Sequence, residues 1–485
     1  MKLKEILGSY KTIKTIGNLD IDINGISQDS RDIRDNYLFI AKEGFNKDGH
    51  DFIDEAIRNG AKCILLEKEI RPKDHITYIW VEDVEDAIAY FSSRFYNEPS
   101  KKLNVIGVTG TNGKTSTTYF IKSILDVNGI NTGLMGTMGV KINDEKIDTV
   151  NTTPDSIIIN STMDKMVKSN IDSIVMEVSS HALDFKRVEY IDFSIGIFTN
   201  LSKDHLDYHK TIENYFKSKE KLFYKTRKYN IINTDDEHGR ELLKHVANRI
   251  DIITYGIENK ADVYATEIEY SMNKVRFLLN YGDDNEVVTL NIPGKFNIYN
   301  ALAAASCGIA YSLDLKQIKD GLEKLDHVKG RFEVVETGRD FSVIIDFAHT
   351  PDGLDNVLKS IRQFAEGRII TVFGAGGNRD KTKRPEMGRT VAAYSDYIII
   401  TSDNPRFEQP EQIIKDIEVG VRVREAKVEY TTIVDRIEAI EYALSIAKAK
   451  DIILLAGKGH ETYTIIEDKT YPCDEREIVL NYLSR

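Results

Sequence analysis

Apolar and polar positions alternate along this chain in two different ways. Up to about residue 97, short apolar runs at 37–41, 63–66 and 76–81 are mixed with amphipathic stretches such as 51–60. This pattern predicts a small unit of strands and helices. Farther along, apolar runs of strand length alternate regularly with helical stretches, which is typical of a mostly parallel sheet covered by helices.

The second region begins near Leu103, after the polar stretch 96–102, whose turn formers and charges predict a linker. Residues 262–292 interrupt the rhythm with alternating segments around a Tyr-Gly-Asp-Asp turn, and they predict antiparallel hairpins at the edge of the sheet. A helix is expected at 297–313. The strands predicted in this region are 104–109, 173–178, 193–199 and 229–233.

A third α/β unit begins near Lys329, and four of its predicted strands run directly into polar or glycine-rich loops. The loops read DFAHTPDG, GAGGNRD, SDNPR and GKGHE. Ligands of open α/β sheets bind beyond the carboxyl ends of the strands, so these loops are expected to converge on one site. The strands that precede them are predicted at 342–346, 369–373, 397–401 and 451–456.

Length and charge complete this picture of an α/β fold in three domains. The chain has 485 residues, enough for about three domains of average size, and the changes of pattern place them at 1–97, 98–328 and 329–485. Its 77 acidic and 65 basic side chains give a net charge of −12. The overall field therefore opposes loose binding to nucleic acid or to an anionic membrane, and an anionic substrate needs a local basic pocket.

The three cysteines, Cys63, Cys307 and Cys473, lie far apart and form neither a disulfide framework nor a paired zinc signature. Lysines interrupt the first residues too often for a signal peptide, and no apolar run approaches the ~18 residues of a membrane span. We therefore expect a cytoplasmic protein with no membrane span.

The strongest single motif is a glycine-rich loop between a strand and a helix, Gly110-Thr111-Asn112-Gly113-Lys114-Thr115-Ser116. In this position backbone N–H groups and the helix N-terminus face phosphates, Lys114 adds a positive charge, and the Thr115 hydroxyl can reach Mg²⁺. The strict P-loop spacing is not met, because Val108 stands where the first glycine belongs. The motif still predicts a phosphate site rather than a plain turn.

Glu177 and His205 follow two other predicted strands of the same sheet, in EVSSH and NLSKDH. A carboxylate and an imidazole at these strand ends can approach the phosphate loop and hold a divalent ion. Helix capping by the neighbouring Ser and Asp, with a surface histidine, explains the same residues equally well. The run HLDYH at 205–209 suits zinc in a hydrolase, although no further ligand spacing supports that alternative.

Two other motifs are incomplete. GAGG at 374–377 matches half of a dinucleotide fingerprint, but Arg379 takes the place of the third glycine, which argues against a nicotinamide site. His460-Glu461 lacks the second histidine of a zinc protease helix.

The chain resembles the Mur ligases. It carries GTNGKT, NTTP, EVSSHAL, LSKDHLDYH, YFKSKEKLF, GKFNIYNALAA, GRFE, DFAHTPD, GGNRDKTKRP, DNPR and GKGHE in the order of that family. The resemblance runs from the DSR of residues 29–31 to GKGHE near the C-terminus. It is greatest to the members that add 2,6-diaminopimelate to UDP-N-acetylmuramoyl-L-alanyl-D-glutamate in peptidoglycan precursor synthesis.

The resemblance implies a UDP-binding N-terminal domain, a central ATPase domain of P-loop type and a Rossmann-like C-terminal domain that delivers the amino acid. It assigns the UDP-muramoyl-peptide to Gln28, Ser30, Phe45, Asn46, Lys47, Asn151, Thr152, Thr153, Ser179 and Arg187. Phe185 departs from the pattern, since some relatives carry a substrate-contacting Gln there.

In this family the lysine of the YFxxK segment is carbamylated, which places the modification on Lys219. A carbamate turns the cation into an anion that, beside Glu177 and His205, completes a site for a second Mg²⁺. Composition alone favours the alternative that Lys219 is an ordinary solvated lysine. Nucleotide contacts beyond the phosphate loop are expected from Asn297, Asn300, Arg331 and Asp346.

The amino-acid pocket follows from the chemistry of meso-diaminopimelate, whose far end carries a carboxylate and an ammonium. Arg406 and Arg379 offer a cationic fork for the carboxylate, whereas Glu461 and the Gly457 carbonyl offer acceptors for the ammonium. Asp403, Asn404 and Pro405, which precede Arg406, are assigned to the same diaminopimelate pocket, although they would also form an ordinary turn. Arg406 is nevertheless the residue that diaminopimelate-adding members carry, and lysine-adding members usually lack it.

The expected function is thus an ATP-dependent ligase that works through an acyl phosphate, with Lys114, Lys219, His205 and Arg331 as its catalytic residues. ATP is the co-substrate, Mg²⁺ the metal, and the partners are small molecules only, with a monomer expected. The alternatives are a lysine-adding Mur ligase, a ligase like folylpolyglutamate synthetase, and a P-loop switch that consumes no amino acid.

Overall fold

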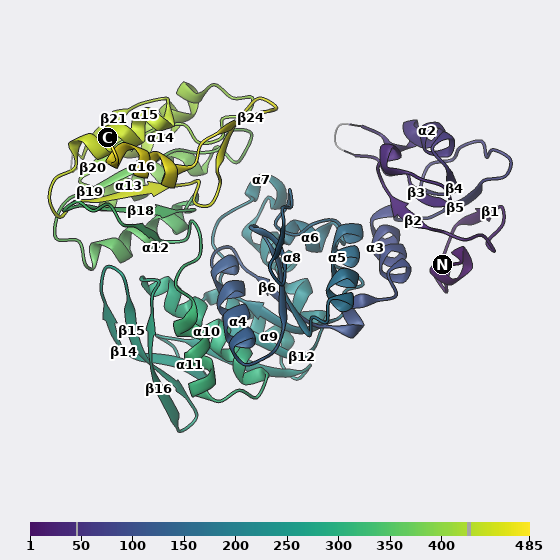
Figure 1. Cartoon of the computed structure of the whole chain (residues 1–485), viewed down its shortest axis with the longest axis horizontal. Coiled ribbons are helices and arrows are strands. Elements are labelled where there is room, and N and C mark those ends of the chain that lie inside the picture. Colours follow the sequence, from purple (N-terminus) through teal and green to yellow (C-terminus); the bar gives the residue numbers. More distant parts are fainter. Residues whose placement is uncertain (45–46, 424–427) are drawn as a thin grey trace.

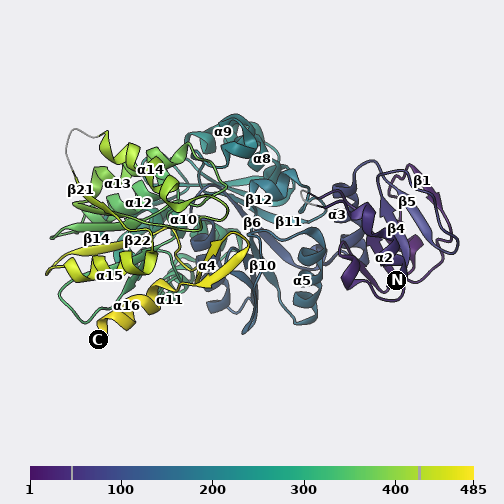
Figure 2. The ribbon, with the colours of Figure 1, turned by 90° about the horizontal axis from the view of Figure 1, so that it is seen from above.

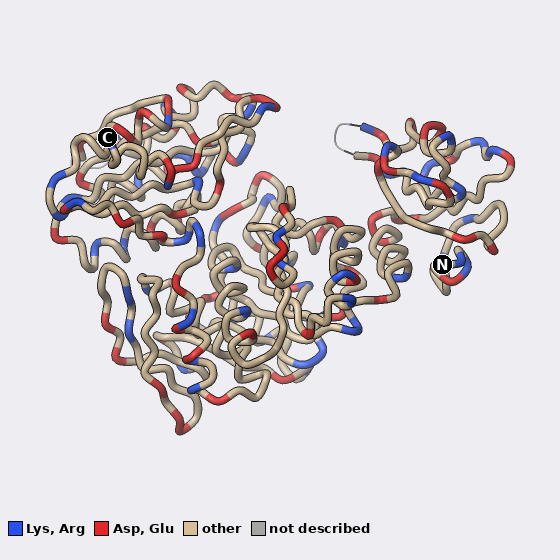
Figure 3. The backbone as a smooth tube through the Cα atoms, in the orientation of Figure 1, with Lys and Arg blue, Asp and Glu red and all other residues tan. Residues whose placement is uncertain are grey.

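The structure is a computed structural model that describes residues 1–44, 47–423 and 428–485. Three α/β units follow one another along the chain, each built on its own sheet (Figure 1). The central unit lies between the other two, as the second view shows (Figure 2). Acidic and basic residues are interspersed over all three units (Figure 3). In the described part of the chain, no helix has the length and apolar character needed to cross a membrane.

The N-terminal unit has a five-stranded sheet in the order β1-β5-β4-β3-β2, in which only β1 runs antiparallel to its neighbour. Continuous apolar runs form β3 to β5 because both faces of these strands are covered. The elements are α1 Leu3–Leu7, β1 Lys14–Ile16, β2 Gly25–Ser27, η1 Ser30–Asp32, β3 Tyr37–Ile40, η2 Gly49–Phe52, α2 Ile53–Arg58, β4 Ala61–Leu66, β5 Thr77–Trp80, α3 Val84–Phe95 and η3 Pro99–Lys102.

The stretch predicted as a linker, 96–102, does connect α3 of the first unit to β6 (Asn104–Thr109) of the second, but it is packed rather than exposed throughout. Pro99 starts the short helix η3 and is buried together with Ser100. The Ser100 hydroxyl accepts a hydrogen bond from the backbone N–H of Asp192 in the central unit at 3.2 Å. Turn-forming residues thus tie the first two units together instead of separating them.

The central unit contains an 11-stranded sheet in the order β16-β15-β14-β13-β12-β11-β6-β10-β7-β8-β9. The predicted hairpins at 262–292 are confirmed as the antiparallel strands β14 to β16 at one edge. Its elements are β6 Asn104–Thr109, α4 Lys114–Val127, β7 Thr132–Gly136, β8 Gly139–Ile142, β9 Glu145–Ile147, α5 Ser156–Lys168, β10 Ser173–Glu177, α6 Ser180–Asp184, β11 Phe193–Phe198, α7 Leu206–His209, α8 Ile212–Glu220, η4 Lys221–Tyr224, β12 Thr226–Asn233, α9 Glu237–Val246, β13 Asp251–Gly256, β14 Val263–Tyr270, β15 Val275–Tyr281, β16 Asp284–Leu290, α10 Lys295–Ala310 and α11 Leu315–Lys324.

Strand β6 lies in the middle of this sheet, paired in parallel with β10 and β11. Its side chains alternate between two cores: Val105 packs with the helices α5 and α8, and Ile106 and Val108 pack with α4 and α10. Three neighbouring strands therefore end at one edge, where the loops after β6, β10 and β11 carry the predicted phosphate and metal residues.

The C-terminal unit has a six-stranded sheet in the order β17-β18-β22-β19-β20-β21, parallel except for β17, and a separate hairpin. Its elements are β17 Glu333–Val335, β18 Ser342–Asp346, α12 Pro351–Arg362, β19 Ile369–Phe373, α13 Lys383–Tyr394, β20 Tyr397–Ile400, α14 Pro410–Arg422, β21 Glu429–Thr432, α15 Arg436–Ile446, β22 Ile452–Ala456, β23 Tyr463–Ile466, β24 Lys469–Pro472 and α16 Glu475–Leu483.

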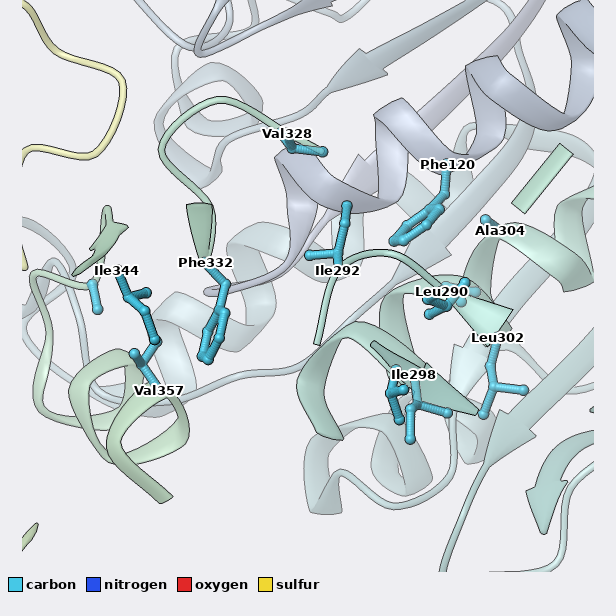
Figure 4. Close-up of a cluster of buried hydrophobic side chains, with 14 of the residues drawn as sticks. Phe120, Leu290, Ile292, Ile298, Leu302, Ala304, Val328, Phe332, Ile344 and Val357 are labelled. Atoms are coloured by element: carbon cyan, nitrogen blue, oxygen red, sulfur yellow. The ribbon is translucent and has the colours of Figure 1, made fainter. Parts of the chain in front are cut away.

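One hydrophobic core runs from the central unit into the C-terminal unit. Phe332 and Val357 of the C-terminal unit belong to the same buried cluster as Phe120 and Ile292 of the central unit (Figure 4). Val328 lies in the connection between them. This shared packing sets the carboxyl edges of the two large sheets beside a common cavity.

Candidate active site

The phosphate loop joins β6 to α4 through two glycines with positive φ, +148° at Gly110 and +84° at Gly113. A Cβ atom at Gly110 would lie 1.9 Å from the Thr199 hydroxyl, and one at Gly113 would lie 2.3 Å from the Asn300 amide oxygen. Both glycines are therefore required by close approach as well as by conformation. The loop ends at the N-terminus of a 14-residue helix, which is the position expected of a phosphate cradle.

Two lysines converge on this loop from different helices. Lys114 Nζ donates to the carbonyl oxygens of Gly110 and Thr111 at 2.9 and 2.7 Å, and Lys219 Nζ from α8 donates to the Gly110 oxygen at 2.8 Å. Lys219 is buried, and its ammonium lies over the Tyr215 ring, 4.6 Å from the centroid. Burial lowers the pKa of Lys219 well below its ordinary value, and the charge of Lys114 lowers it further.

Thr115 connects the phosphate loop to a carboxylate and to a guanidinium. Its hydroxyl donates to Glu177 Oε1 at 3.0 Å and accepts from Arg331 Nη2 of the C-terminal unit at 3.1 Å. Glu177 also accepts from the backbone N–H and the hydroxyl of Thr137, at 2.9 and 3.0 Å. The Arg331 guanidinium lies over the Phe347 ring, 4.4 Å from the centroid, so an aromatic face supports it.

The donors at this site suit a hard divalent cation, although the metal residues predicted do not all touch. In the described chain, no group of three or more His, Cys, Asp or Glu side chains is arranged to hold a metal ion. Glu177 and Thr115 offer oxygen ligands, which Mg²⁺ prefers. A Cβ at Gly136 would lie 2.3 Å from Glu177 Oε1, so the space around this carboxylate is kept open by a glycine.

His205 lies in the loop after β11 with a left-handed backbone, at φ +54°. Its Nε2 lies 3.4 Å from Asp204 Oδ2, and its ring is 5.0 Å from the His181 ring. Partial burial lowers the pKa of His205, which favours the neutral imidazole that a metal requires. His205 and Glu177 both line the central cavity.

Three other residues predicted to contact the nucleotide take part in hydrogen bonds around the site. Asn300 faces the cavity, and its amide donates to Asn297 Oδ1 at 3.1 Å, while Asn297 itself is buried and donates to the Pro293 oxygen. Asn297 thus orients Asn300. In the C-terminal unit, Asp346 accepts from the backbone N–H groups of Phe332 and Ala348, each at 2.7 Å. The bond to Phe332 fixes the backbone directly after Arg331.

Asp352 is a contact that the sequence reasoning missed. It lies in the first turn of α12, and its Oδ2 accepts from Asn112 Nδ2 of the phosphate loop at 2.6 Å and from the Ser202 hydroxyl at 3.1 Å. The C-terminal unit is therefore hydrogen-bonded directly to the phosphate loop. The DFAHTPDG motif contains this residue, but no local pattern separates it from an ordinary helix-starting aspartate.

The convergence of the four C-terminal loops is confirmed. A cavity of about 870 Å³ is lined by residues from all of them and by the phosphate loop. Its lining includes Lys114, Thr115, Glu177, His205, Arg331, Asp346, Asp352, Arg379, Asp403, Asn404, Arg406, Gly457 and Glu461.

Two arginines face this cavity side by side. Arg406 Nη1 donates to the Gly377 carbonyl at 2.9 Å, and neither Arg406 nor Arg379 forms an ion pair with any carboxylate of the described chain. Burial, and then the charge of Arg379, lower the pKa of Arg406. Two neighbouring guanidinium groups without a carboxylate partner can bind an anionic group of a ligand.

The remaining residues of this pocket are held by close packing. Asp403 is buried, and a Cβ at Gly457 would lie 2.7 Å from its Oδ2, whereas a Cβ at Gly377 would lie 1.9 Å from the Pro405 oxygen. Burial, and then the charge of Asp403, raise the pKa of Glu461.

Three residues predicted to hold the muramoyl-peptide form one hydrogen-bonded group. The Thr153 hydroxyl donates to Ser179 Oγ at 3.3 Å, and Arg187 Nη1 donates to the Thr153 oxygen at 2.9 Å. The Arg187 guanidinium also lies 5.8 Å from the centroid of the Phe185 ring. Thr152 lines the cavity, and Asn151 is exposed.

The N-terminal residues predicted to hold UDP lie apart from this cavity, whose lining begins at Thr111. Ser30 is buried, and its carbonyl accepts from the Asn59 amide at 2.8 Å, while Lys47 lies over the Phe52 ring. Gln28 is half-buried in the same unit. Phe45 and Asn46 lie outside the described residues.

Comparisons with known proteins decide the family. Residues 108–308 match the Mur ligase middle domain, residues 330–459 the Mur ligase glutamate ligase domain, and residues 22–96 the Mur ligase family catalytic domain. The chain belongs to the Mur ligase family.

Relatives with assigned names extend over the whole chain. A protein of Clostridium acetobutylicum named UDP-N-acetylmuramoyl-L-alanyl-D-glutamate--2,6-diaminopimelate ligase 1 is 47% identical over 485 residues, covering 100% of this chain and 99% of its own. The ligase of the same name in Clostridioides difficile, without the number, is 44% identical over 100% of both chains.

Solved structures agree on the arrangement of the three Mur ligase domains. A structure titled UDP-N-acetylmuramoyl-L-alanyl-D-glutamate--2,6-diaminopimelate ligase is 31% identical, with a TM-score of 0.71 over 100% of this chain and 99% of its own. MurF from Acinetobacter baumannii shares the fold with the same TM-score at 18% identity, over 100% of this chain and 99% of its own.

Proposed function

We propose that this Mur ligase joins meso-2,6-diaminopimelate to UDP-N-acetylmuramoyl-L-alanyl-D-glutamate at the expense of ATP. The observation that carries the proposal is one cavity lined both by the phosphate loop and by the unpaired guanidinium groups of Arg379 and Arg406. The names of the two relatives support the same substrates. A Mur ligase from Thermotoga maritima has been solved with ADP, which supports ATP as the co-substrate.

The reaction has two steps. A carboxylate oxygen of the dipeptide's terminal glutamate attacks the γ-phosphorus of ATP, and the bond from phosphorus to the bridging oxygen breaks, releasing ADP and leaving an acyl phosphate. The amine of the incoming amino acid then adds to the acyl carbon, loses a proton, and expels phosphate from the tetrahedral intermediate. Lys114 and Arg331 neutralise the charge that builds up on the phosphoryl oxygens, so no nucleophilic side chain is needed.

The C-terminal unit supplies part of this machinery. Arg331 reaches Thr115 of the central unit, and Asp352 reaches Asn112 in the same loop. Closure of this unit on the central one therefore brings the arginine and the amino-acid pocket to the phosphate loop together, which is a gating step and not a chemical one.

Magnesium fits the oxygen donors of Thr115 and Glu177, and we propose that these two residues hold it. A bound Mg²⁺ neutralises phosphate charge and orients the phosphoryl group. A second ion would be held by His205 and Lys219, the latter as a carbamate. The buried Lys219 supports this assignment, because its lowered pKa favours the neutral amine that reacts with carbon dioxide.

Formation of this carbamate requires only carbon dioxide and the Lys219 amine, and no second enzyme. The neutral Lys219 amine adds to the carbon of carbon dioxide, a nitrogen–carbon bond forms, and one proton leaves for solvent. The product carries a negative charge where an ammonium stood, so it adds an oxygen ligand beside Glu177 and His205.

The UDP-muramoyl end of the substrate is assigned to two parts of the chain. Thr152, Thr153, Ser179, Arg187 and the exposed Asn151 would hold the peptide and sugar near Glu177. Gln28, Ser30 and the loop Phe45-Asn46-Lys47 of the N-terminal unit would hold the uridine diphosphate.

The choice of amino acid rests on the far end of the pocket. Arg406 and Arg379 would pair with the second carboxylate of diaminopimelate, and Glu461 with the Gly457 carbonyl would accept from its ammonium. Lysine has no such carboxylate and would leave the guanidinium groups unpaired. A lysine-adding ligase is therefore the main alternative.

The test is an ADP-release assay with ATP, Mg²⁺ and the UDP-muramoyl-dipeptide. It is run with meso-diaminopimelate, with L-lysine and with no amino acid, and a further reaction contains glutamate and a folate in place of the dipeptide and the diamino acid. ADP release should require meso-diaminopimelate. Release that needs no amino acid would indicate a nucleotide switch, and release only with glutamate and a folate would indicate a folylpolyglutamate synthetase.

A further inference from the structure

Lys458 takes no part in either step of the reaction, although it is a fully buried lysine in one of the loops that form the amino-acid pocket. It follows β22, in the loop between Gly457 and Glu461, and its side chain is 0% exposed. Its Nζ donates to the Tyr463 carbonyl at 2.6 Å and to Asn404 Oδ1 at 3.2 Å. A buried ammonium is costly unless its partners are fixed, so these contacts require an explanation.

Lys458 determines which way the Asn404 amide faces. Asn404 Oδ1 accepts from the Lys458 ammonium and from the backbone N–H of Ile465, at 3.2 and 2.9 Å. Both groups can only donate, so the oxygen of the amide must face them. The amide nitrogen is then turned to Glu461 and donates to its Oε2 at 2.9 Å.

As a result, one oxygen of the Glu461 carboxylate is fixed by a hydrogen bond and the other is not. Glu461 Oε2 is engaged by the Asn404 amide and lies 3.9 Å from Lys458 Nζ. The other oxygen, Oε1, has no hydrogen-bond partner in the described chain and belongs to a residue that lines the cavity. A carboxylate fixed at one oxygen presents the other in a defined direction.

We propose that Lys458 is a positioning residue that orients the Asn404 amide and thereby holds Glu461 ready to accept the ammonium group of the incoming diamino acid. This inference rests on the proposed function, because it deepens the assignment of the same pocket. Lys458 itself does not touch the substrate. It acts through the Asn404 amide on Glu461, which does.

The charges around Glu461 support this role. Asp403, Arg406 and Lys458 act on this carboxylate from two loops, and Asn404 and Tyr463 lie beside it. Removing the positive charge of Lys458 would take away the cation that acts on both Asp403 and Glu461, two carboxylates that influence each other. Glu461 would then be held in its neutral form or turned away, and neither state accepts an ammonium well.

The first test compares Lys458→Met with the wild type in steady-state kinetics. KM for meso-diaminopimelate should rise about 10-fold or more, the range for a buried partner left unsatisfied, whereas KM for ATP and for the UDP-muramoyl-dipeptide should change less than about twofold. Lys450→Met is the matched control. Lys450 flanks the other end of β22, pairs with Glu366 and has a 68% exposed side chain, so its loss should change none of these constants.

A double-mutant cycle separates positioning from general destabilisation. If Lys458 acts through Glu461, then Lys458→Met should add less than about twofold to KM for the diamino acid in a Glu461→Gln background. Full additivity, or an equal rise of KM for ATP and for the diamino acid, would overturn the proposal.

Asn404→Asp provides a variant that keeps the size of the side chain. Its carboxylate still accepts from Lys458 and Ile465, but it has no N–H for Glu461, so KM for the diamino acid should rise as much as in Lys458→Met. An unchanged KM would overturn the orientation argument even if Lys458→Met fails to fold. If the proposed function itself is wrong, even the wild type will show no diaminopimelate-dependent turnover, so the two failures can be told apart.

Discussion

Lys114 and Lys219 donate to the same atom, the carbonyl oxygen of Gly110, at 2.9 and 2.8 Å. Two ammonium groups on one oxygen repel each other, and the charge of Lys114 adds to burial in lowering the pKa of Lys219. Lys114 is expected to move towards bound ATP, because phosphate oxygens are stronger hydrogen-bond acceptors for an ammonium than a carbonyl oxygen is. Lys219 cannot follow, since it is enclosed beside Tyr215. The arrangement favours its conversion to an anion.

Carbamylation of Lys219 predicts a specific pattern of inactive variants. Lys219→Ala and Lys219→Arg should both be nearly inactive, because neither side chain can form the carbamate, while Lys217→Arg on the exposed side of the same helix should be normal. Carbon-13 NMR of the protein in labelled bicarbonate should show a carbamate signal that is absent from Lys219→Arg. An active Lys219→Arg enzyme would refute the modification.

Glu177 and His205 are predicted to act through the metal. Glu177→Ala and His205→Ala should lower turnover by about 100-fold or more, with a much smaller loss of folding stability for His205, whose side chain is 44% exposed. Titration with Mg²⁺ under turnover conditions should show a raised requirement in both variants. Wild-type activity of His205→Ala at limiting Mg²⁺ would remove this residue from the metal site.

Arg406 is predicted to carry the discrimination between the two candidate amino acids. Arg406→Ala should reduce kcat/KM for meso-diaminopimelate by about 10-fold or more and leave the low value for lysine almost unchanged, because only diaminopimelate has a carboxylate to pair with the guanidinium. The ratio of the two kcat/KM values is the measurement. A variant that discriminates as well as the wild type would show that the far carboxylate binds elsewhere.

Glu408 links stability to pH in the C-terminal unit. It accepts from Arg384 at 2.9 and 3.0 Å and from the backbone N–H of Asn378, next to Arg379. These bonds, chiefly those of Arg384, lower the pKa of Glu408 to about 2. Because the folded pKa is depressed, the stabilisation is present above the unfolded pKa of about 4.3 and is lost as the pH falls towards about 2.

Glu408→Gln should therefore unfold more easily at pH 7 than the wild type, by about 1–3 kcal/mol. The difference should shrink progressively below about pH 4.3, as the wild-type carboxylate becomes protonated. Urea denaturation at a series of pH values measures it. A difference that does not depend on pH would mean that charge at Glu408 is unimportant.

The fold was largely predictable because the buried parallel strands are continuous apolar runs. Strands 104–109, 342–346 and 369–373 were predicted at the bounds observed. Strand β7 was missed, because its sequence TGLMG contains two glycines and reads as a turn. The hairpin β23–β24 was missed as well, since its residues are mostly exposed and lack apolar alternation.

The site was predictable where the residue types of a local motif indicate its chemistry. The glycine-rich loop and the loops after the C-terminal strands carry charged residues at strand ends, and strand ends meet at one sheet edge. Asp352 and Lys458 were visible in DFAHTPDG and GKGHE, but their roles depend on partners 240 and 54 positions away in the chain. Such contacts are set by how the units pack, and spacing along the sequence does not encode them.

The central claim is tested most directly by the product of a competition. The protein is incubated with ATP, Mg²⁺, the UDP-muramoyl-dipeptide and equal concentrations of meso-diaminopimelate and L-lysine, and the nucleotide-linked products are resolved by mass spectrometry. We expect the diaminopimelate adduct to dominate, with one ADP and one phosphate released for each amide formed. A product made mainly of the lysine adduct, or ADP release without any nucleotide-linked tripeptide, would contradict it.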